Sequence, residues 1–134
     1  MPDPPQDVSQ KAVSSRGGDH SGLGQWGERK AAEYLQGQGY RLLDTRCREG
    51  EIDLILVREP YLCFVEVKLR KDADLAQARE SVTPAKQRKV RMAALRYLSQ
   101  HPSRLQPRFD VVEVYAPQGV ETVLPTIYHL ENAF

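Results

Sequence analysis

The chain has 134 residues, of which 40% are apolar and 28% charged, a composition typical of a soluble globular protein. This length suits one domain with a modest core, and no apolar run approaches the ~20 residues that a membrane-spanning helix needs. The N-terminus lacks the basic and then apolar pattern of an export signal, so we expect a cytoplasmic protein.

The net charge of +1 conceals an uneven distribution of charged residues. Between Lys68 and Arg108 there are eleven Lys and Arg residues against three Asp and Glu, whereas the rest of the chain has eight against fifteen. Such asymmetry predicts a face that prefers a polyanion, although a charge run is also typical of a solvated helix surface. The candidate nucleic-acid contacts are Arg70, Lys71, Arg88, Lys89 and Arg91.

The N-terminal region divides into a tail and a helix. Residues 1–20 are rich in Pro, Ser, Gly and Asp, which predicts a disordered tail in front of a single domain over residues 21–134. Apolar and small residues then repeat at helical spacing over residues 21–38, which predicts an amphipathic helix ended by nearby glycines. Glu28 lies at the edge of the apolar stripe. It is either a surface carboxylate or one that leans into a site beneath the helix.

Apolar and β-branched residues predict three strands, over residues 40–46, 52–57 and 62–70. The short polar segment 58–61 separates the last two strands, which predicts an antiparallel hairpin. In this hairpin Val57 faces Leu62, and Asp53 then lies directly opposite Glu66 with the Cβ atoms ~5 Å apart. A slip of register by one residue would remove this alignment.

The third strand is apolar on both faces at its start, which is typical of a central strand buried on both sides. Glu66 and Lys68 nevertheless share one face of it, and unpartnered buried charges cost several kcal/mol. The opposed carboxylates of Asp53 and Glu66 repel each other unless a ligand binds both, and a divalent cation with oxygen ligands would do so. The ordinary alternative is a buried ion pair in a core network.

A second helix is predicted to begin at Pro84, with Thr83 as its N-cap. Its apolar stripe starts at Val90, and Lys86 precedes Val90 by one helical turn on the packed side, next to Gln87. Basic residues cover much of the remaining helix surface. The helix would therefore bring a lysine to the core side and a positive surface to the solvent side.

The C-terminal region is predicted to complete the sheet. A strand over residues 109–115 follows the second helix, and a helix between two strands implies a right-handed crossover to a parallel neighbour. Residues 126–130 are predicted to add a short edge strand, and residues 132–134 to cap the core.

Six stretches of the sequence carry a resemblance to a known family: GQWGERKAAEYLQGQGYRLL, GEIDLI, FVEVKLR, TPAKQRKVRMAALRYL, RFDVVEV and ENAF. Through these stretches the chain resembles the YraN-like family of bacterial proteins over about residues 22–134. That family is placed within the restriction-endonuclease-like superfamily of PD-(D/E)xK nucleases. The resemblance implies an α/β fold with an αβββαβ core, in which helices flank a mixed sheet.

The resemblance also implies the site residues. Asp53, Glu66 and Lys68 match the nuclease triad, and Glu28 matches the first-helix acid of Holliday-junction-resolvase-type members. Lys86 or Gln87 lies where many members carry a further polar residue. The superfamily's proline before the first acid is replaced here by Ile52.

The implied mechanism is metal-dependent hydrolysis of phosphodiester bonds in a nucleic acid, with DNA expected ahead of RNA. Mg²⁺ or Mn²⁺ would be held by Asp53 and Glu66, aided by Glu28, while Lys68 orients the attacking water. A nucleic-acid-binding module without cleavage and an interaction domain with a buried ion cluster are the alternatives. No membrane partner is expected, and a homodimer is left open.

Overall fold

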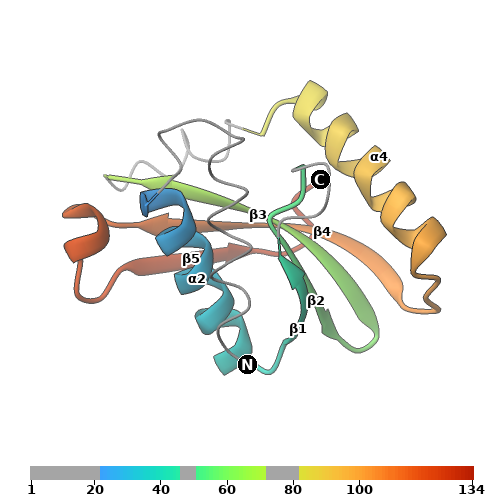
Figure 1. The fold of residues 1–134 in the computed structure, drawn as a ribbon, viewed down its shortest axis with the longest axis horizontal. Helices are drawn as coiled ribbons and strands as arrows, with labels where there is room; N and C mark the ends of the chain where they lie inside the picture. Colours follow the sequence, from blue (N-terminus) through green and yellow to red (C-terminus); the bar gives the residue numbers. More distant parts are fainter. Residues whose placement is uncertain (1–21, 46–50, 72–81) are drawn as a thin grey trace.

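The computed structural model describes residues 22–45, 51–71 and 82–134, so the predicted disordered tail lies outside it. These residues form one mixed sheet with two long helices (Figure 1). The elements in order are α2 (Gly22–Gly37), β1 (Arg41–Thr45), β2 (Leu54–Arg58), β3 (Tyr61–Arg70), α4 (Pro84–Gln100), β4 (Gln106–Tyr115), the short 3₁₀-helix η2 (Gly119–Glu121) and β5 (Thr126–Leu130). This order confirms the predicted α/β class with an αβββαβ core. None of the helices in the described ranges is long and apolar enough to cross a membrane.

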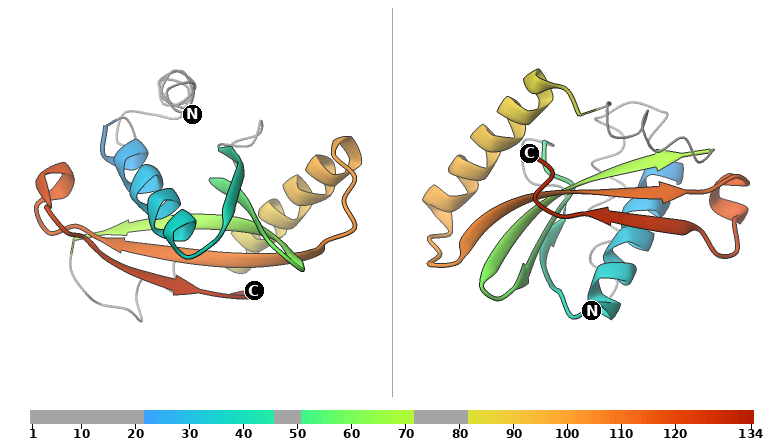
Figure 2. Two further views of the ribbon diagram at one scale, coloured as in Figure 1. Left: turned by 90° about the horizontal axis from the view of Figure 1, so that it is seen from below. Right: turned by 180° about the vertical axis from the view of Figure 1, so that it is seen from behind.

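The five strands lie in the order β1-β2-β3-β4-β5. Three neighbouring pairs are antiparallel, whereas β3 and β4 are parallel. The helix α4 lies between these two strands in the sequence, and their parallel pairing is as predicted. Figure 2 shows the sheet from its edge and from behind, with β5 as one outer strand.

Two apolar cores lie on opposite faces of the sheet. The core beneath α2 contains Cys63 and Val65 of β3, and the core beneath α4 contains Leu62 and Phe64 of the same strand. Because successive side chains of a strand point to opposite faces, the two helices cover different faces. In Figure 1, α2 crosses in front of the strands, whereas α4 lies at the upper right of the sheet.

The β2–β3 hairpin has the predicted register. Val57 pairs with Leu62, and the same pairing continues to Leu54 and Val65. The prediction that residues 58–61 form the loop is wrong at its ends, because Arg58 and Tyr61 also pair and leave a connection of only two residues. β2 begins at Leu54, so Asp53 directly precedes the strand instead of lying within it.

Local sequence explains how the two helices are placed. The side chain of Thr83 accepts a hydrogen bond from Lys86 N and caps α4, and Pro84 occupies the first turn, as predicted. This cap fixes α4 at the end that carries Lys86. On α2, Gly27 permits close packing on β3, because a Cβ atom there would lie 3.1 Å from Leu69 Cδ1.

Candidate active site

The residues of β3 become less buried toward the end of the strand. Its residues 62–65 are buried, Glu66 is 7% exposed, and Lys68 is half-buried. Glu66 and Lys68 share a face with Phe64, so both point to the side of the sheet that α4 covers. The site therefore lies where the buried part of this face gives way to solvent.

Asp53 is held against the same strand. Its Oδ2 atom accepts a hydrogen bond from Val67 N at 2.8 Å, and the side chain is largely buried. Continuing the observed register by one position places Asp53 opposite Glu66. The structure thus brings together the two carboxylates that the sequence predicted to be adjacent.

Two lysines neutralise part of this negative charge. Lys68 Nζ lies 3.6 Å from Glu66 Oε2, and Lys86 Nζ lies 3.8 Å from the same oxygen. Lys86 also forms a closer ion pair with Glu51, at 3.2 Å to Oε1. The sequence analysis missed Glu51, although it lies within the GEIDLI stretch two residues before Asp53.

Glu66 is electrostatically the most perturbed member of the group. Burial in the core raises its pKa from 4.5 to about 7, with a further contribution from the nearby Asp53 carboxylate. Lys86 and Lys68 oppose this shift without cancelling it. Among the described residues, its buried Oε1 atom has no hydrogen-bond partner. One oxygen of Glu66 is therefore paired with lysines, and the other has no donor within the described ranges.

This donor set fits a hard divalent cation. Mg²⁺ is commonly bound by one or two carboxylates and keeps several waters, which matches the pair Asp53 and Glu66. A bound cation would satisfy the buried Glu66 Oε1 atom and offset the repulsion between the two acids. The described ranges contain no group of three or more His, Cys, Asp or Glu side chains that could hold a metal ion. Water or a substrate oxygen would have to complete the coordination.

The remaining predicted site residues differ in their position. Gln87 donates from Nε2 to Val82 O at 3.1 Å, so Lys86 is the accessory candidate that contacts the acid. Glu28 is half-buried on α2, the helix on the opposite face of the sheet. The role of Glu28 as a metal ligand stays a prediction.

The predicted nucleic-acid contacts fall into two groups. Arg88 and Lys89 are exposed on α4, whereas the Arg91 guanidinium lies over the aromatic rings of Phe109 and Phe134. Arg70 is the last residue of β3 and is half-buried, whereas Lys71 directly follows the strand and is exposed. Positive charge therefore surrounds the candidate site from both β3 and α4.

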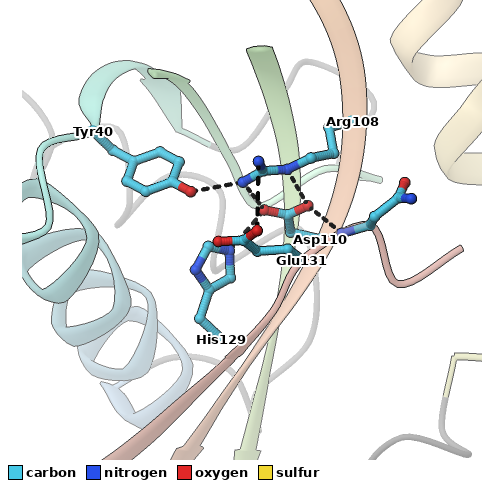
Figure 3. A network of polar contacts seen from close by, with 6 residues as sticks. Tyr40, Arg108, Asp110, His129 and Glu131 are labelled. Atoms are coloured by element: carbon cyan, nitrogen blue, oxygen red, sulfur yellow. Dashed lines mark hydrogen bonds and ion pairs between the residues drawn. The ribbon is translucent and has the colours of Figure 1, made fainter. Parts of the chain in front are cut away.

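A second polar cluster lies on the other face of the sheet, and the sequence analysis did not find it. Asp110 of β4 is fully buried and occupies the centre of the cluster (Figure 3). Its two carboxylate oxygens accept hydrogen bonds from Arg108 Nε at 3.0 Å and Nη2 at 2.8 Å. His129 Nε2 lies 2.7 Å from Oδ2, and Asn132 N donates to Oδ1. Arg108 also donates to the Tyr40 hydroxyl at 2.7 Å.

The Asp110 cluster joins parts of the chain that are distant in sequence. Hydrogen bonds from His129 and Arg108 lower the pKa of Asp110, although burial alone would raise it. The contacts connect β4 to β5, to the residues after β5 and to the start of β1. A carboxylate with all its acceptor positions used in this way is a structural element.

Comparison with known proteins gives a consistent result along most of the chain. A family model described as "Uncharacterised protein family UPF0102" matches residues 27–114, which contain every predicted site residue. A UPF0102 protein of Alkalilimnicola ehrlichii is 47% identical over 97 residues, covering 69% of this chain and 77% of the relative. One of Myxococcus xanthus is 41% identical over 114 residues, covering 83% and 87%. One of Pelobacter propionicus is 39% identical over 137 residues, covering 97% and 95%.

Proposed function

This chain belongs to the UPF0102 family, and since that description assigns no activity, we propose a function from the candidate active site. The function is that of a metal-dependent nuclease that hydrolyses phosphodiester bonds of DNA or RNA. The observation that carries the proposal is the buried Oε1 atom of Glu66, which has no hydrogen-bond partner in the part of the chain that the structure describes and lies beside a second carboxylate and two lysines.

Each residue of the group has a defined task in this proposal. Asp53 and Glu66 would hold Mg²⁺ or Mn²⁺, which when bound lowers the pKa of an attacking water and polarises a phosphate oxygen. Asp53 is fixed for this task by its hydrogen bond to Val67 N. Lys68, which is half-buried beside Glu66, orients the attacking water and stabilises the negative charge that develops on the phosphoryl oxygens.

Lys86 has a positioning task. It connects Glu66 of β3 to Glu51, which precedes β2, and it is carried by the capped first turn of α4. This bridge fixes the side chain of Glu66 from the helix side and leaves Lys68 to face the substrate. Around the site, Arg88 and Lys89 would contact flanking phosphates, which add affinity without reading sequence.

A cleavage screen tests the proposal directly. Purified protein would be incubated with single-stranded, duplex, flapped and four-way-junction substrates in the presence of Mg²⁺ or Mn²⁺. We expect cleavage of at least one substrate, and its loss in Asp53→Asn and in Lys68→Ala, because each change removes a group at the reacting centre. Glu33→Gln is the matched control, since Glu33 is an exposed carboxylate of α2. Wild-type cleavage by a folded Asp53→Asn or Lys68→Ala variant would remove that residue from the mechanism.

Nucleic-acid binding without cleavage is the second candidate. It is favoured by the observation that the described residues contain no group of three or more His, Cys, Asp or Glu side chains that could hold a metal ion. Under this alternative, binding weakens steeply with salt while no substrate is cut in any metal. Replacing both Arg88 and Lys89 with Ala should reduce the slope of log affinity against log salt by about 2. An unchanged slope would place the contact surface elsewhere.

A further inference from the structure

The sheet face that carries Glu66 continues beyond the candidate active site. In the paired registers, Lys68 of β3 lies beside Glu113 of β4, and Glu113 lies beside Tyr128 of β5. Paired residues project from the same face, so these three side chains form one row across the sheet. Strands lie ~4.8 Å apart, which places Tyr128 about 10 Å from Lys68.

An open pocket of about 490 Å³ lies at this end of the sheet. Its walls come from three parts of the chain: the end of β3, the end of β4 and the segment from η2 to β5. Lining residues that matter here are Lys71, Tyr115, Glu121, Thr126, Leu124 and Tyr128. Tyr128 is on the edge strand β5 and is 40% exposed, so its ring is accessible to a ligand.

The two tyrosines form a rigid wall. Their ring centroids are 5.7 Å apart with an interplanar angle of 87°, so one ring packs edge-on against the other. The hydroxyl of Tyr115 donates to Glu113 Oε1 at 3.4 Å, and Glu113 is fully buried beneath it. Tyr115 is thereby held as the inner ring, and the ring of Tyr128 remains accessible from the pocket.

The chemistry of the lining suits a nucleobase better than a phosphate. Lys71 and Glu121 bring one charge of each sign, so the pocket does not concentrate positive charge. An aromatic ring beside an apolar side chain such as Leu124 offers a stacking surface, and the hydroxyl of Thr126 can form a hydrogen bond with a base edge. The positive charges that would hold the intervening backbone lie on β3, at Lys68 and Arg70.

We infer that this pocket, formed around Tyr128, binds an unpaired nucleobase of the strand whose backbone occupies the candidate active site. The inference rests on the proposed function and specifies its substrate: a nucleic acid with a single-stranded segment close to the contacted phosphates. A separation of about 10 Å corresponds to roughly three nucleotides of a stacked strand at 3.4 Å each. The base in the pocket therefore lies only a few nucleotides from the phosphate at Glu66.

Metal-free binding measurements test the inference separately from cleavage. The probes are a fluorescein-labelled duplex with a single-stranded thymidine tail and the same duplex with blunt ends. Tyr128→Ala should weaken binding of the tailed duplex by about 5- to 150-fold, the range of one base–aromatic contact, and leave the blunt duplex unchanged. Tyr128→Phe keeps the ring and should bind within about twofold of the wild type. Tyr34→Ala is the matched control, because Tyr34 is a partly exposed ring on α2.

A spectroscopic probe adds a second readout. With 2-aminopurine in the tail, the wild type and Tyr128→Phe should quench its fluorescence by stacking, whereas Tyr128→Ala and Tyr128→Leu should not. Tyr128→Leu retains apolar volume and replaces Tyr128→Ala in this measurement if the alanine variant does not fold.

Several results would overturn the inference. Wild-type affinity and quenching in Tyr128→Ala would do so, and so would equal weakening of tailed and blunt probes. A dimer that Leu124→Ser dissociates, together with tail binding independent of Tyr128, would assign the pocket to self-association. Absence of cleavage with intact Tyr128-dependent tail binding would reject the nuclease but retain the pocket.

Discussion

The two faces of the sheet each contain a buried carboxylate surrounded by charged neighbours, and the two clusters are built differently. Asp110 accepts hydrogen bonds on both oxygens from Arg108, with His129 and a backbone N–H as further partners. Glu66 has lysines 3.6 and 3.8 Å from one oxygen and, in the described part of the chain, no hydrogen-bond partner for the other. The first cluster is complete as it stands, whereas the second still has room for a ligand.

The pKa values of the two acids are shifted in opposite directions. The partners of Asp110 lower its pKa, so this group stabilises the fold above its ordinary pKa of 3.8 and loses that contribution as the pH falls. Burial and Asp53 raise the pKa of Glu66, so ionising it opposes folding. The complete set of partners around Asp110 therefore indicates a structural role, whereas the incomplete set around Glu66, beside Asp53 and two lysines, favours a site.

The largest expected difference concerns the removal of each charge. Asp110→Asn leaves the guanidinium of Arg108 buried without its ionic partner and should lower the free energy of unfolding by about 3–5 kcal/mol. Glu66→Gln removes a charge that lacks full compensation and should leave stability equal or higher at neutral pH. Denaturant melts of both variants beside the wild type provide the measurement. Equal destabilisation by the two changes would make the Glu66 cluster a closed structural network as well.

A second difference should appear in the pH dependence of stability. Because the folded pKa of Glu66 is about 7 and its ordinary value is 4.5, the folded state keeps a proton that the unfolded state releases. The free energy of unfolding should therefore fall as the pH rises between these values, by about 3 kcal/mol in total. Glu66→Gln should lack this decrease. Parallel stability curves for variant and wild type between pH 4.5 and 7 would contradict the raised pKa.

The smallest expected effects concern metal and Asp53. Mn²⁺ at a hundredfold excess over its Kd should stabilise the wild type by about 2.7 kcal/mol, since it binds only the folded state. Without metal, Asp53→Asn should leave stability unchanged or raise it by roughly 0.2–1 kcal/mol, the scale of an opposed pair of like charges. The same variant should lose most of the stabilisation by Mn²⁺. Strong destabilisation of Asp53→Asn, beside a wild type indifferent to Mn²⁺, would identify a closed ion network.

The candidate active site could be predicted from the sequence because its geometry is local. Asp53 and Glu66 belong to one hairpin with a short connection, so alternation and loop length together fix which residues face each other. The spacing to Val90 placed Lys86 on the packed side of its helix, whereas its place in the site was implied by the family resemblance. In each case the argument needed only the period of one element and one short-range pairing.

The Asp110 cluster depends on contacts that no local pattern reveals. Tyr40, Arg108 and His129 come from widely separated parts of the chain and meet only when β4 lies between its final neighbours. One signal was present: Asp110 and Glu113 are acids within a mostly apolar strand, a pattern like that which marked Asp53 beside its strand. The sequence could mark such acids as buried, but whether each has partners depends on the tertiary structure.

The topology of the sheet has a consequence for the order in which the site forms during folding. The carboxylates of Asp53 and Glu66 are brought together by a hairpin, a short-range contact that closes fast. Lys86 reaches them only when α4 docks, together with the parallel pairing of β3 and β4, which joins residues as far apart as Tyr61 and Gln106. In the hairpin only Lys68 offsets the repulsion between the acids, and Lys86, the second lysine that offsets it, arrives later. Removing Asp53's charge should accelerate hairpin formation, whereas removing Lys86 should chiefly accelerate unfolding.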